Sequence, residues 1–189
     1  MKVLSFDVES NGLQGDAFAV AGIVTDASHT IHSEFVARCP IIGPVDQWVS
    51  ENVLGPMSDI KDTHADVKTL RDAFWEWYTE AKTQADFIVA SNPYPVEARF
   101  LIACQSDDMP VREFEHPFPF YDLSSILFGL GFATALERRE FVIASIGQAR
   151  GDAHNPLWDA KATAWTALKA ISESSAKSGI ISINSKATA

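Results

Sequence analysis

Two carboxylates stand at the end of the first apolar segment, in the run Ser-Phe-Asp-Val-Glu-Ser-Asn-Gly. Asp7 and Glu9 are two residues apart, and at that spacing in a β-strand both side chains point to the same face of the sheet. Two carboxylates that leave a buried strand together repel each other unless cations lie between them, and oxygen-rich clusters suit Mg²⁺ or Mn²⁺. Glu113 and Glu115 have the same spacing without the apolar lead-in, so the alternative is that such a pair merely faces water.

A histidine and an aspartate lie close together near the last helical segment, in Asp-Ala-His-Asn-Pro-Leu-Trp-Asp. Pro156 is suited to a first helical turn, which places Asp159 just inside the helix and His154 in the loop before it. Anionic groups are favoured at a helix N-terminus, so the alternative is a surface aspartate that compensates the helix dipole beside an ordinary loop histidine. Of the five histidines, only His154 has an aspartate five residues later.

A third acidic residue, Glu97, occupies the first turn of a helix that follows a strand. Acidic residues are common in that position because of the helix dipole alone. By itself Glu97 therefore indicates no function.

Together, these three segments resemble the motifs of the DnaQ-like DEDDh exonuclease superfamily, over residues 3 to about 170. The run from Phe6 to Leu13 resembles the first motif, and His154 with Asp159 resembles the third, His-x4-Asp. Asn155 excludes the alternative Tyr-x3-Asp form. The second motif departs from the family, because Glu97 stands three residues before Phe-Leu where the family has Asp.

The resemblance implies a metal-dependent 3′–5′ exonuclease that releases nucleoside 5′-monophosphates. Two divalent cations, Mg²⁺ or Mn²⁺, would be held by four carboxylates, with His154 as general base, since histidine titrates near neutral pH. The implied metal ligands are Asp7, which bridges both ions, Glu9 and Asp159 at the first ion, and Glu97 at the second. The substrate-binding residues would be those of the following turn, Ser10, Asn11, Gly12 and Leu13, with Leu13 against the last base.

The resemblance also implies a partner, the 3′ end of DNA or RNA, with short or single strands favoured and a homodimer expected. Two rival hypotheses stay open. One is a catalytically degenerate binding module of the same fold, which the glutamate at position 97 and the acidic surface favour. The other is a phosphodiesterase that acts on dinucleotides or other small phosphate esters.

The elements that must position these residues follow from hydrophobic periodicity and turn residues. Apolar, β-branched runs predict five strands: Lys2 to Val8, Phe18 to Val24, Thr30 to Ala37, Asp86 to Ala90 and Phe118 to Leu123. Helices are predicted from Val67 to Ala81, from Pro95 to about Gln105 and from Pro156 to about Ser172, with short helices in 124–147 and an irregular loop in 39–63. The order predicts an α/β fold with a mixed five-stranded sheet whose first three strands are antiparallel, flanked by helices, and the resemblance makes it ribonuclease H-like. Asp122, at a strand end, is interpreted as structural.

Bulk properties limit the classes of protein. At 189 residues with 47% hydrophobic residues, the chain predicts one domain over 1–173 and a polar tail over 174–189 that is either a loose terminus or an edge strand. The absence of a long apolar run and of paired cysteine motifs predicts a soluble, cytoplasmic protein. The net charge of −10 argues against extended binding of duplex nucleic acid, which needs a basic stripe.

Overall fold

A five-stranded mixed sheet forms the centre of the protein, in the order β3-β2-β1-β4-β5. The computed structural model describes residues 1–147 and 153–178. β1, β2 and β3 pair antiparallel, whereas β4 runs parallel to β1 and β5 parallel to β4. The strands are β1 Lys2–Ser10, β2 Ala17–Asp26, β3 Ile31–Arg38, β4 Phe87–Ala90 and β5 Phe120–Asp122. This architecture confirms the predicted mixed sheet with three antiparallel strands first.

The strand ends differ from the prediction for local reasons. β1 continues to Ser10 and β2 begins at Ala17, because the ladder passes through a register shift between Glu9 and Ser10 and still pairs these two ends. β5 is shorter than predicted: Asp122 accepts hydrogen bonds from the backbone N–H groups of Ser124 and Ser125, so α5 begins at the next residue. Asp122 thus has the structural role that the sequence indicated.

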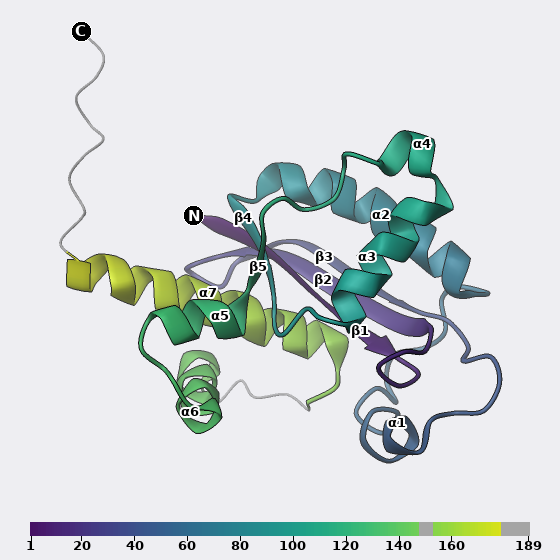
Figure 1. Ribbon diagram of the computed structural model, residues 1–189, viewed down its shortest axis with the longest axis horizontal. Coiled ribbons are helices and arrows are strands. Elements are labelled where there is room, and N and C mark those ends of the chain that lie inside the picture. The colour runs from purple at the N-terminus through teal and green to yellow at the C-terminus, as the bar shows by residue number, and fades with distance from the viewer. Residues whose placement is uncertain (148–152, 179–189) are drawn as a thin grey trace, which may run out of the picture.

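Two helices cover one face of the sheet, α2 Val67–Ala81 and α3 Val96–Asp107 (Figure 1). The apolar stripe of α2 buries Leu70, Phe74 and Tyr78 against the side chains of β1 and β2 on that face. Gly22 of β2 lies on this face too, where a Cβ atom would come within 2.4 Å of the indole of Trp77. Glycine is therefore required here for the close approach of α2 to the sheet.

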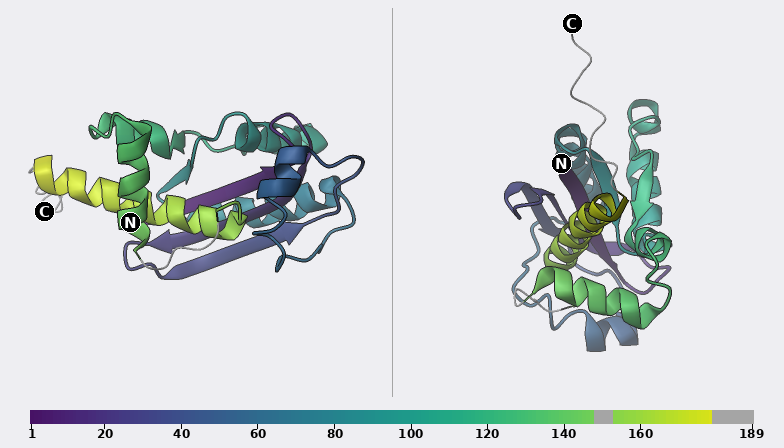
Figure 2. Two further views of the ribbon diagram at one scale, coloured as in Figure 1. Left: turned by 90° about the horizontal axis from the view of Figure 1, so that it is seen from below. Right: turned by 90° about the vertical axis from the view of Figure 1, so that its left-hand side faces the viewer.

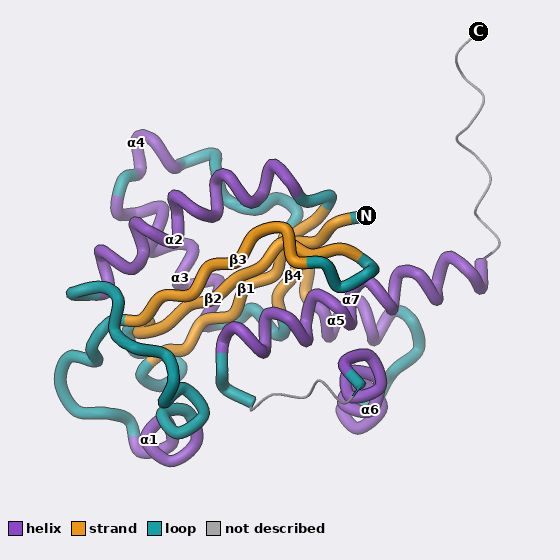
Figure 3. The backbone as a smooth tube through the Cα atoms, turned by 180° about the vertical axis from the view of Figure 1, so that it is seen from behind, coloured by secondary structure: helices purple, strands orange, loops and turns teal. Residues whose placement is uncertain are grey.

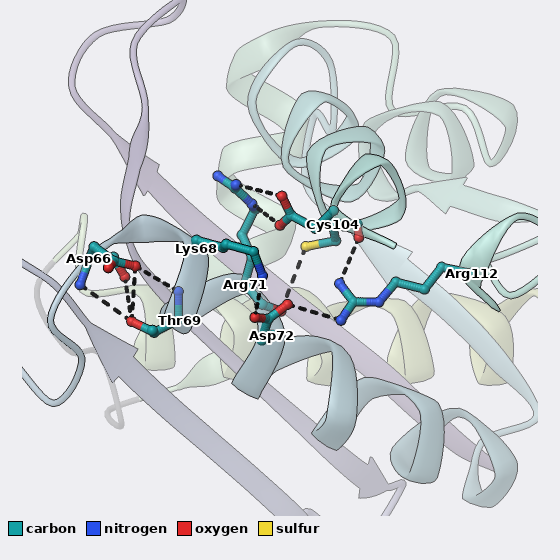
Figure 4. Close-up of polar contacts among 8 residues, drawn as sticks. Asp66, Lys68, Thr69, Arg71, Asp72, Cys104 and Arg112 are labelled. Atoms are coloured by element: carbon teal, nitrogen blue, oxygen red, sulfur yellow. Dashed lines mark hydrogen bonds and ion pairs between the residues drawn. The ribbon is translucent and has the colours of Figure 1, made fainter. Parts of the chain in front are cut away.

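A polar network joins α2 to α3 and to the short helix α4 Met109–Arg112, which follows α3 (Figure 4). Arg71 donates two hydrogen bonds to Asp107, at 2.6 and 2.9 Å. Arg112 donates to the carboxylate of Asp72 at 2.9 Å and to the carbonyl of Cys104 at 2.7 Å. The half-buried, bidentate Arg71 pair fixes α3 along α2, and α3 in turn carries Glu97.

The opposite face of the sheet is covered by α7 Pro156–Ser178, with α5 Leu123–Gly129 and α6 Ala135–Ile146 packed on it. Figures 1 and 3, seen from opposite sides, show the two helical layers with the sheet between them. α7 extends beyond the predicted end, so residues 174–178 of the predicted tail are helical; residues 179–189 lie outside the described residues. None of the helices in the described parts of the chain has the length and hydropathy of a membrane span.

The segment 39–63, predicted to be an irregular loop, contains the helix α1 Gln47–Asn52. Asp46 caps it by accepting a hydrogen bond from the N–H of Val49, at 3.2 Å. Val49, Val53 and Met57, spaced by four residues, are buried in the core. The prediction failed here because the prolines and glycines of the segment outweighed this short apolar repeat.

Candidate active site

Near its carboxyl end, β1 has no strand partner on the edge that faces β4, and the site lies at this open edge. The parallel pairing of β1 with β4 stops at Ser5, four residues before Glu9. Beyond that point the N–H of Val8 has no strand partner and instead donates to the carboxylate of Glu97, at 3.3 Å. Asp7 and Glu9, flanking Val8, face the α7 side of the sheet, as does Val3 in the core beneath α7.

Glu97 reaches β1 from the first turn of α3. Its side chain is 5% exposed, and Phe100 and Leu101 anchor the helix in the core one turn later. Because α3 starts directly after the β4 turn, its N-terminus lies beside the open edge of β1. The glutamate that departs from the family motif therefore points into the site and not into solvent.

His154 and Asp159 close the site from the N-terminus of α7. The backbone of His154 adopts the left-handed conformation, with φ 66°, which is uncommon for a residue other than glycine. In this conformation its N–H donates to Asp159, at 2.8 Å, and its Nδ1 lies 3.7 Å from Oε1 of Glu9. The His154 ring and the indole of Trp48 form a T-shaped pair at a centroid distance of 5.1 Å. The strained loop thus holds the imidazole over the carboxylates.

One cavity of about 820 Å³ contains all five residues that the motifs nominate. Ser10, Gly12 and Leu13 of the predicted substrate-binding turn also line it, whereas Asn11 does not. The side chain of Asn11 turns outward, donating to the carbonyl of Pro44 at 2.9 Å and accepting from the N–H of Asp46 at 2.8 Å. Asn11 therefore ties the β1–β2 turn to the segment before α1, and these two lie side by side in Figure 2.

The β1–β2 turn is held from a second side by α3. Arg99 donates to the carbonyl of Leu13 at 2.9 Å and to that of Gln14 at 2.8 Å. Within the turn the backbone is compact: a Cβ atom on Gly15 would lie 2.0 Å from the carbonyl oxygen of Asn11. Leu13, 66% exposed, is consequently fixed at the rim of the cavity although little of its side chain is packed.

Burial raises the pKa of every carboxylate of the site, and the charges of neighbouring carboxylates add to this for Asp7 and Glu9. Burial, followed by the charges of Asp159, Glu97 and Glu9, raises the pKa of Asp7 well above its usual range. Burial and the charges of Asp159 and Glu97 raise the pKa of Glu9 to about 8. For Glu97, burial outweighs the hydrogen bonds from backbone N–H groups and raises the pKa to about 7.

The donor set fits divalent cations. One ligand atom from each of Glu9, His154 and Asp159 lies within 4.8 Å of the other two. Asp7 is close enough to this group that the charges of Asp159 and Glu9 raise its pKa. Among the described residues that line the cavity, none is Lys or Arg. Since uncompensated buried charge is unfavourable and carboxylate oxygens are the preferred ligands of Mg²⁺ and Mn²⁺, a bound cation would relieve the repulsion.

Asp46, Trp48 and Tyr94 are among the cavity residues that were not identified from the sequence. Asp46 and Trp48 belong to the segment that was predicted to be irregular, and Tyr94 lies in the turn between β4 and α3. An isolated aromatic residue in a loop carries no periodic signal. The one available indication was the Asp-Gln-Trp order, in which a helix-capping residue precedes an aromatic one.

The fold is similar to that of known exonucleases. At the level of sequence, neither a family model nor a curated protein matches the chain. The nuclease domain of 3′hExo, a DEDDh family member bound to rAMP, is 14% identical with a TM-score of 0.61, and the similarity covers 91% of this chain and 92% of that one. Exonuclease X, in complex with 5′ overhanging duplex DNA, is 15% identical with a TM-score of 0.57 and the same two coverages.

A further similar structure is Exonuclease I of E. coli, in complex with a dT13 oligonucleotide. It is 13% identical with a TM-score of 0.61, and the similarity covers 94% of this chain but 42% of that one, so this chain spans less than half of its length. Each of the three similarities covers at least 91% of this chain. The chain therefore has the ribonuclease H-like fold of the DEDDh exonucleases, as its motifs predicted.

Proposed function

We propose that this protein is a metal-dependent exonuclease that removes nucleoside 5′-monophosphates from the 3′ end of a nucleic-acid strand. The observation that carries the proposal is the convergence of four carboxylates and one histidine, from three separated segments, on one cavity. The fold shared with DEDDh exonucleases supports the same reading. The cavity is open to solvent at the exposed residues Leu13 and Trp48, as binding of a strand end requires.

The four carboxylates, Asp7, Glu9, Glu97 and Asp159, are the residues that would hold Mg²⁺ or Mn²⁺. Bound there, two such ions supply orientation of a water molecule and neutralisation of charge on the leaving oxygen. By the resemblance, Asp7 would contact both ions, and its surroundings support this assignment because the charges of the other three carboxylates all raise its pKa. The hydrogen bond from Val8 orients the carboxylate of Glu97 toward the same space.

His154 is assigned the role of general base. Its imidazole is 39% exposed at the side-chain level and lies over Glu9, so it can reach a water molecule in the cavity. Its backbone N–H is bound to Asp159, which fixes the ring relative to the carboxylates. A histidine held in this way is placed to accept a proton from the attacking water.

Ser10, Gly12 and Leu13 are assigned to the terminal nucleotide. They line the cavity on a turn that Arg99 and Asn11 hold from two sides. Asn11 was predicted to belong to this set; its side-chain contacts now assign it to holding the turn. Leu13, exposed at the rim, offers an apolar surface for the face of the last base.

Strands labelled at one end test both the activity and its direction. With Mn²⁺ or Mg²⁺, a 3′-labelled oligonucleotide should release labelled mononucleotide at once, while a 5′-labelled one should give a descending ladder. Asp7→Asn and His154→Ala should each abolish release, whereas two exposed residues outside the cavity provide matched controls, Asp59→Asn and His116→Ala.

Each other outcome contradicts a named part of the proposal. Immediate release of the 5′ label would reverse the direction. Full activity of Asp7→Asn or His154→Ala would refute the role of that residue. Binding of Mn²⁺ with no turnover on any strand would favour the degenerate binding module.

A further inference from the structure

The cavity offers a nucleic-acid strand aromatic surfaces, but its described lining carries no fixed positive charge. Its lining, within the described residues, contains five carboxylates, the four of the site and Asp46, and no Lys or Arg. Two described cations on elements that border the cavity are engaged elsewhere: Arg99 of α3 with the carbonyls of the β1–β2 turn, and Lys161 of α7 with Glu34 at 3.0 Å. Tight binding along several phosphates requires Lys and Arg side chains that neutralise them. The described lining therefore offers no such contacts along a long backbone.

Two exposed aromatic side chains supply another kind of contact. Trp48 is 53% exposed and Tyr94 is 83% exposed, and both line the cavity. Trp48 belongs to α1, whose capping residue Asp46 is tied to the β1–β2 turn, and Tyr94 lies in the turn after β4, the parallel neighbour of β1. The two rings thus reach the cavity that contains Asp7 and Glu9 from different elements. Large aromatic surfaces that stay exposed beside a reactive centre are suited to stacking on unpaired bases.

We propose that the site recognises the last one or two unpaired nucleotides of a single strand by stacking on Trp48 and Tyr94, so that short oligonucleotides are substrates as good as long ones. The proposal rests on the proposed function and adds its substrate class. Stacking is tolerant of base identity, because every base has a π-face. Recognition by stacking also predicts little dependence on salt, in contrast to recognition through phosphates.

The first test compares wild-type kcat/KM on single strands of 2, 3, 5, 10 and 24 nucleotides, at 50 and 200 mM salt. We expect less than about a threefold change beyond three nucleotides, and a similarly small loss with salt. A strand held through six phosphates would instead lose about 300-fold over this salt range. A tenfold rise in kcat/KM from 3 to 24 nucleotides, or a loss with salt above tenfold, would overturn the proposal. No release from any of these strands would instead refute the proposed function.

The second test separates stacking from other roles of the rings. Trp48→Ala and Tyr94→Leu should raise KM about tenfold or more with kcat nearly unchanged, and Trp48→Phe should restore KM. Phe118→Ala is the matched control, because Phe118 is 91% exposed and does not line the cavity. The three cavity variants alter exposed side chains, so their melting temperatures should match the wild type.

A strand whose last two nucleotides lack their bases completes the second test. If the rings act by stacking, this strand is a poor substrate for the wild type. Trp48→Ala and Tyr94→Leu should then lower kcat/KM on this strand no further. Trp48 also touches the ring of His154, so a role in orienting that histidine would instead lower kcat equally on strands with and without bases. That result, or unchanged KM in both variants, would overturn the assignment.

Discussion

The metal-free protein should be destabilised by its own site, and Glu9→Gln should stabilise it. Glutamine has nearly the shape of a protonated glutamate and carries no charge at any pH. Glu9 is 9% exposed, and burial together with the charges of Asp159 and Glu97 raises its pKa from 4.5 to about 8. The folded protein thus takes up a proton that the unfolded chain releases at neutral pH.

The magnitude follows from the shift in pKa. A raised carboxyl pKa means that stability is highest below about pH 4.5 and is lost as the pH rises towards 8. Each unit corresponds to about 1.4 kcal/mol, so at pH 7 the free energy of unfolding is lowered by about 3 kcal/mol. The Glu9–His154 contact, at 3.7 Å with the histidine partly exposed, offsets less than about 1 kcal/mol of this. Glu9→Gln should therefore gain about 2–3 kcal/mol at pH 7.

Urea unfolding followed by tryptophan fluorescence, in EDTA, measures this gain. In thermal unfolding it corresponds to a rise in Tm on the order of 5–10 °C for a domain of this size. At pH 5 the difference should fall below about 1 kcal/mol, because the unfolded chain then also retains much of its proton. Adding Mn²⁺ at pH 7 should raise the Tm of the wild type more than that of Glu9→Gln, since ligand binding to the folded state stabilises it.

Glu76→Gln is the matched control, because Glu76 is an exposed residue of α2 and does not line the cavity. It should change the free energy of unfolding little, at pH 7 or at pH 5. If Glu9→Gln were no more stable than the wild type in EDTA, or if its gain were the same at both pH values, buried repulsion among the carboxylates would be the wrong account.

Other predictions test the supports of the site and of the core. Arg99→Ala should release the β1–β2 turn and raise KM several-fold, with kcat less affected and Arg99→Lys intermediate, as measured by steady-state kinetics. Gly22→Ala should lower the free energy of unfolding by about 1–3 kcal/mol, because its methyl group would meet the indole of Trp77, and the smaller ring of Trp77→Phe should recover part of that loss in the double variant. Burial raises the pKa of Cys39 to about 11 and that of Cys104 to about 12, so both thiols should react with a disulfide reagent in urea and only slowly in the native protein.

The sequence predicted the sheet well because its signals are local. β1 and β2 each contain a short apolar run with β-branched residues, and Asn11-Gly12 marks the turn between them. The stripe of α2 gave the correct bounds, since its apolar residues recur every three or four positions and Asp66 caps its start. Where structure depends on tertiary contacts, the prediction failed, as for α1, which is six residues long and is held by its buried Val49.

The site could be predicted in composition but not in geometry. The spacing of Asp7 and Glu9 indicated a shared face, and His154 was singled out by its distance from Asp159. No local pattern could show that the pairing of β1 with β4 stops at Ser5, because that end point depends on how two segments distant in sequence pack together. Trp48 was missed for the same reason, since its helix forms only against the rest of the fold.

The structure changes the interpretation of Glu97, which stands where the family motif has aspartate. From the motif alone, its extra methylene suggested a degenerate second position. In the structure the open edge of β1 leaves the N–H of Val8 without a strand partner, and the carboxylate of Glu97 accepts from it. Burial raises the pKa of Glu97, whereas this hydrogen bond lowers it. The hydrogen bond therefore favours the ionised carboxylate, the form that binds a cation. The longer side chain thus pairs with the backbone while still lining the cavity, so the substitution by itself is no argument for a lost activity.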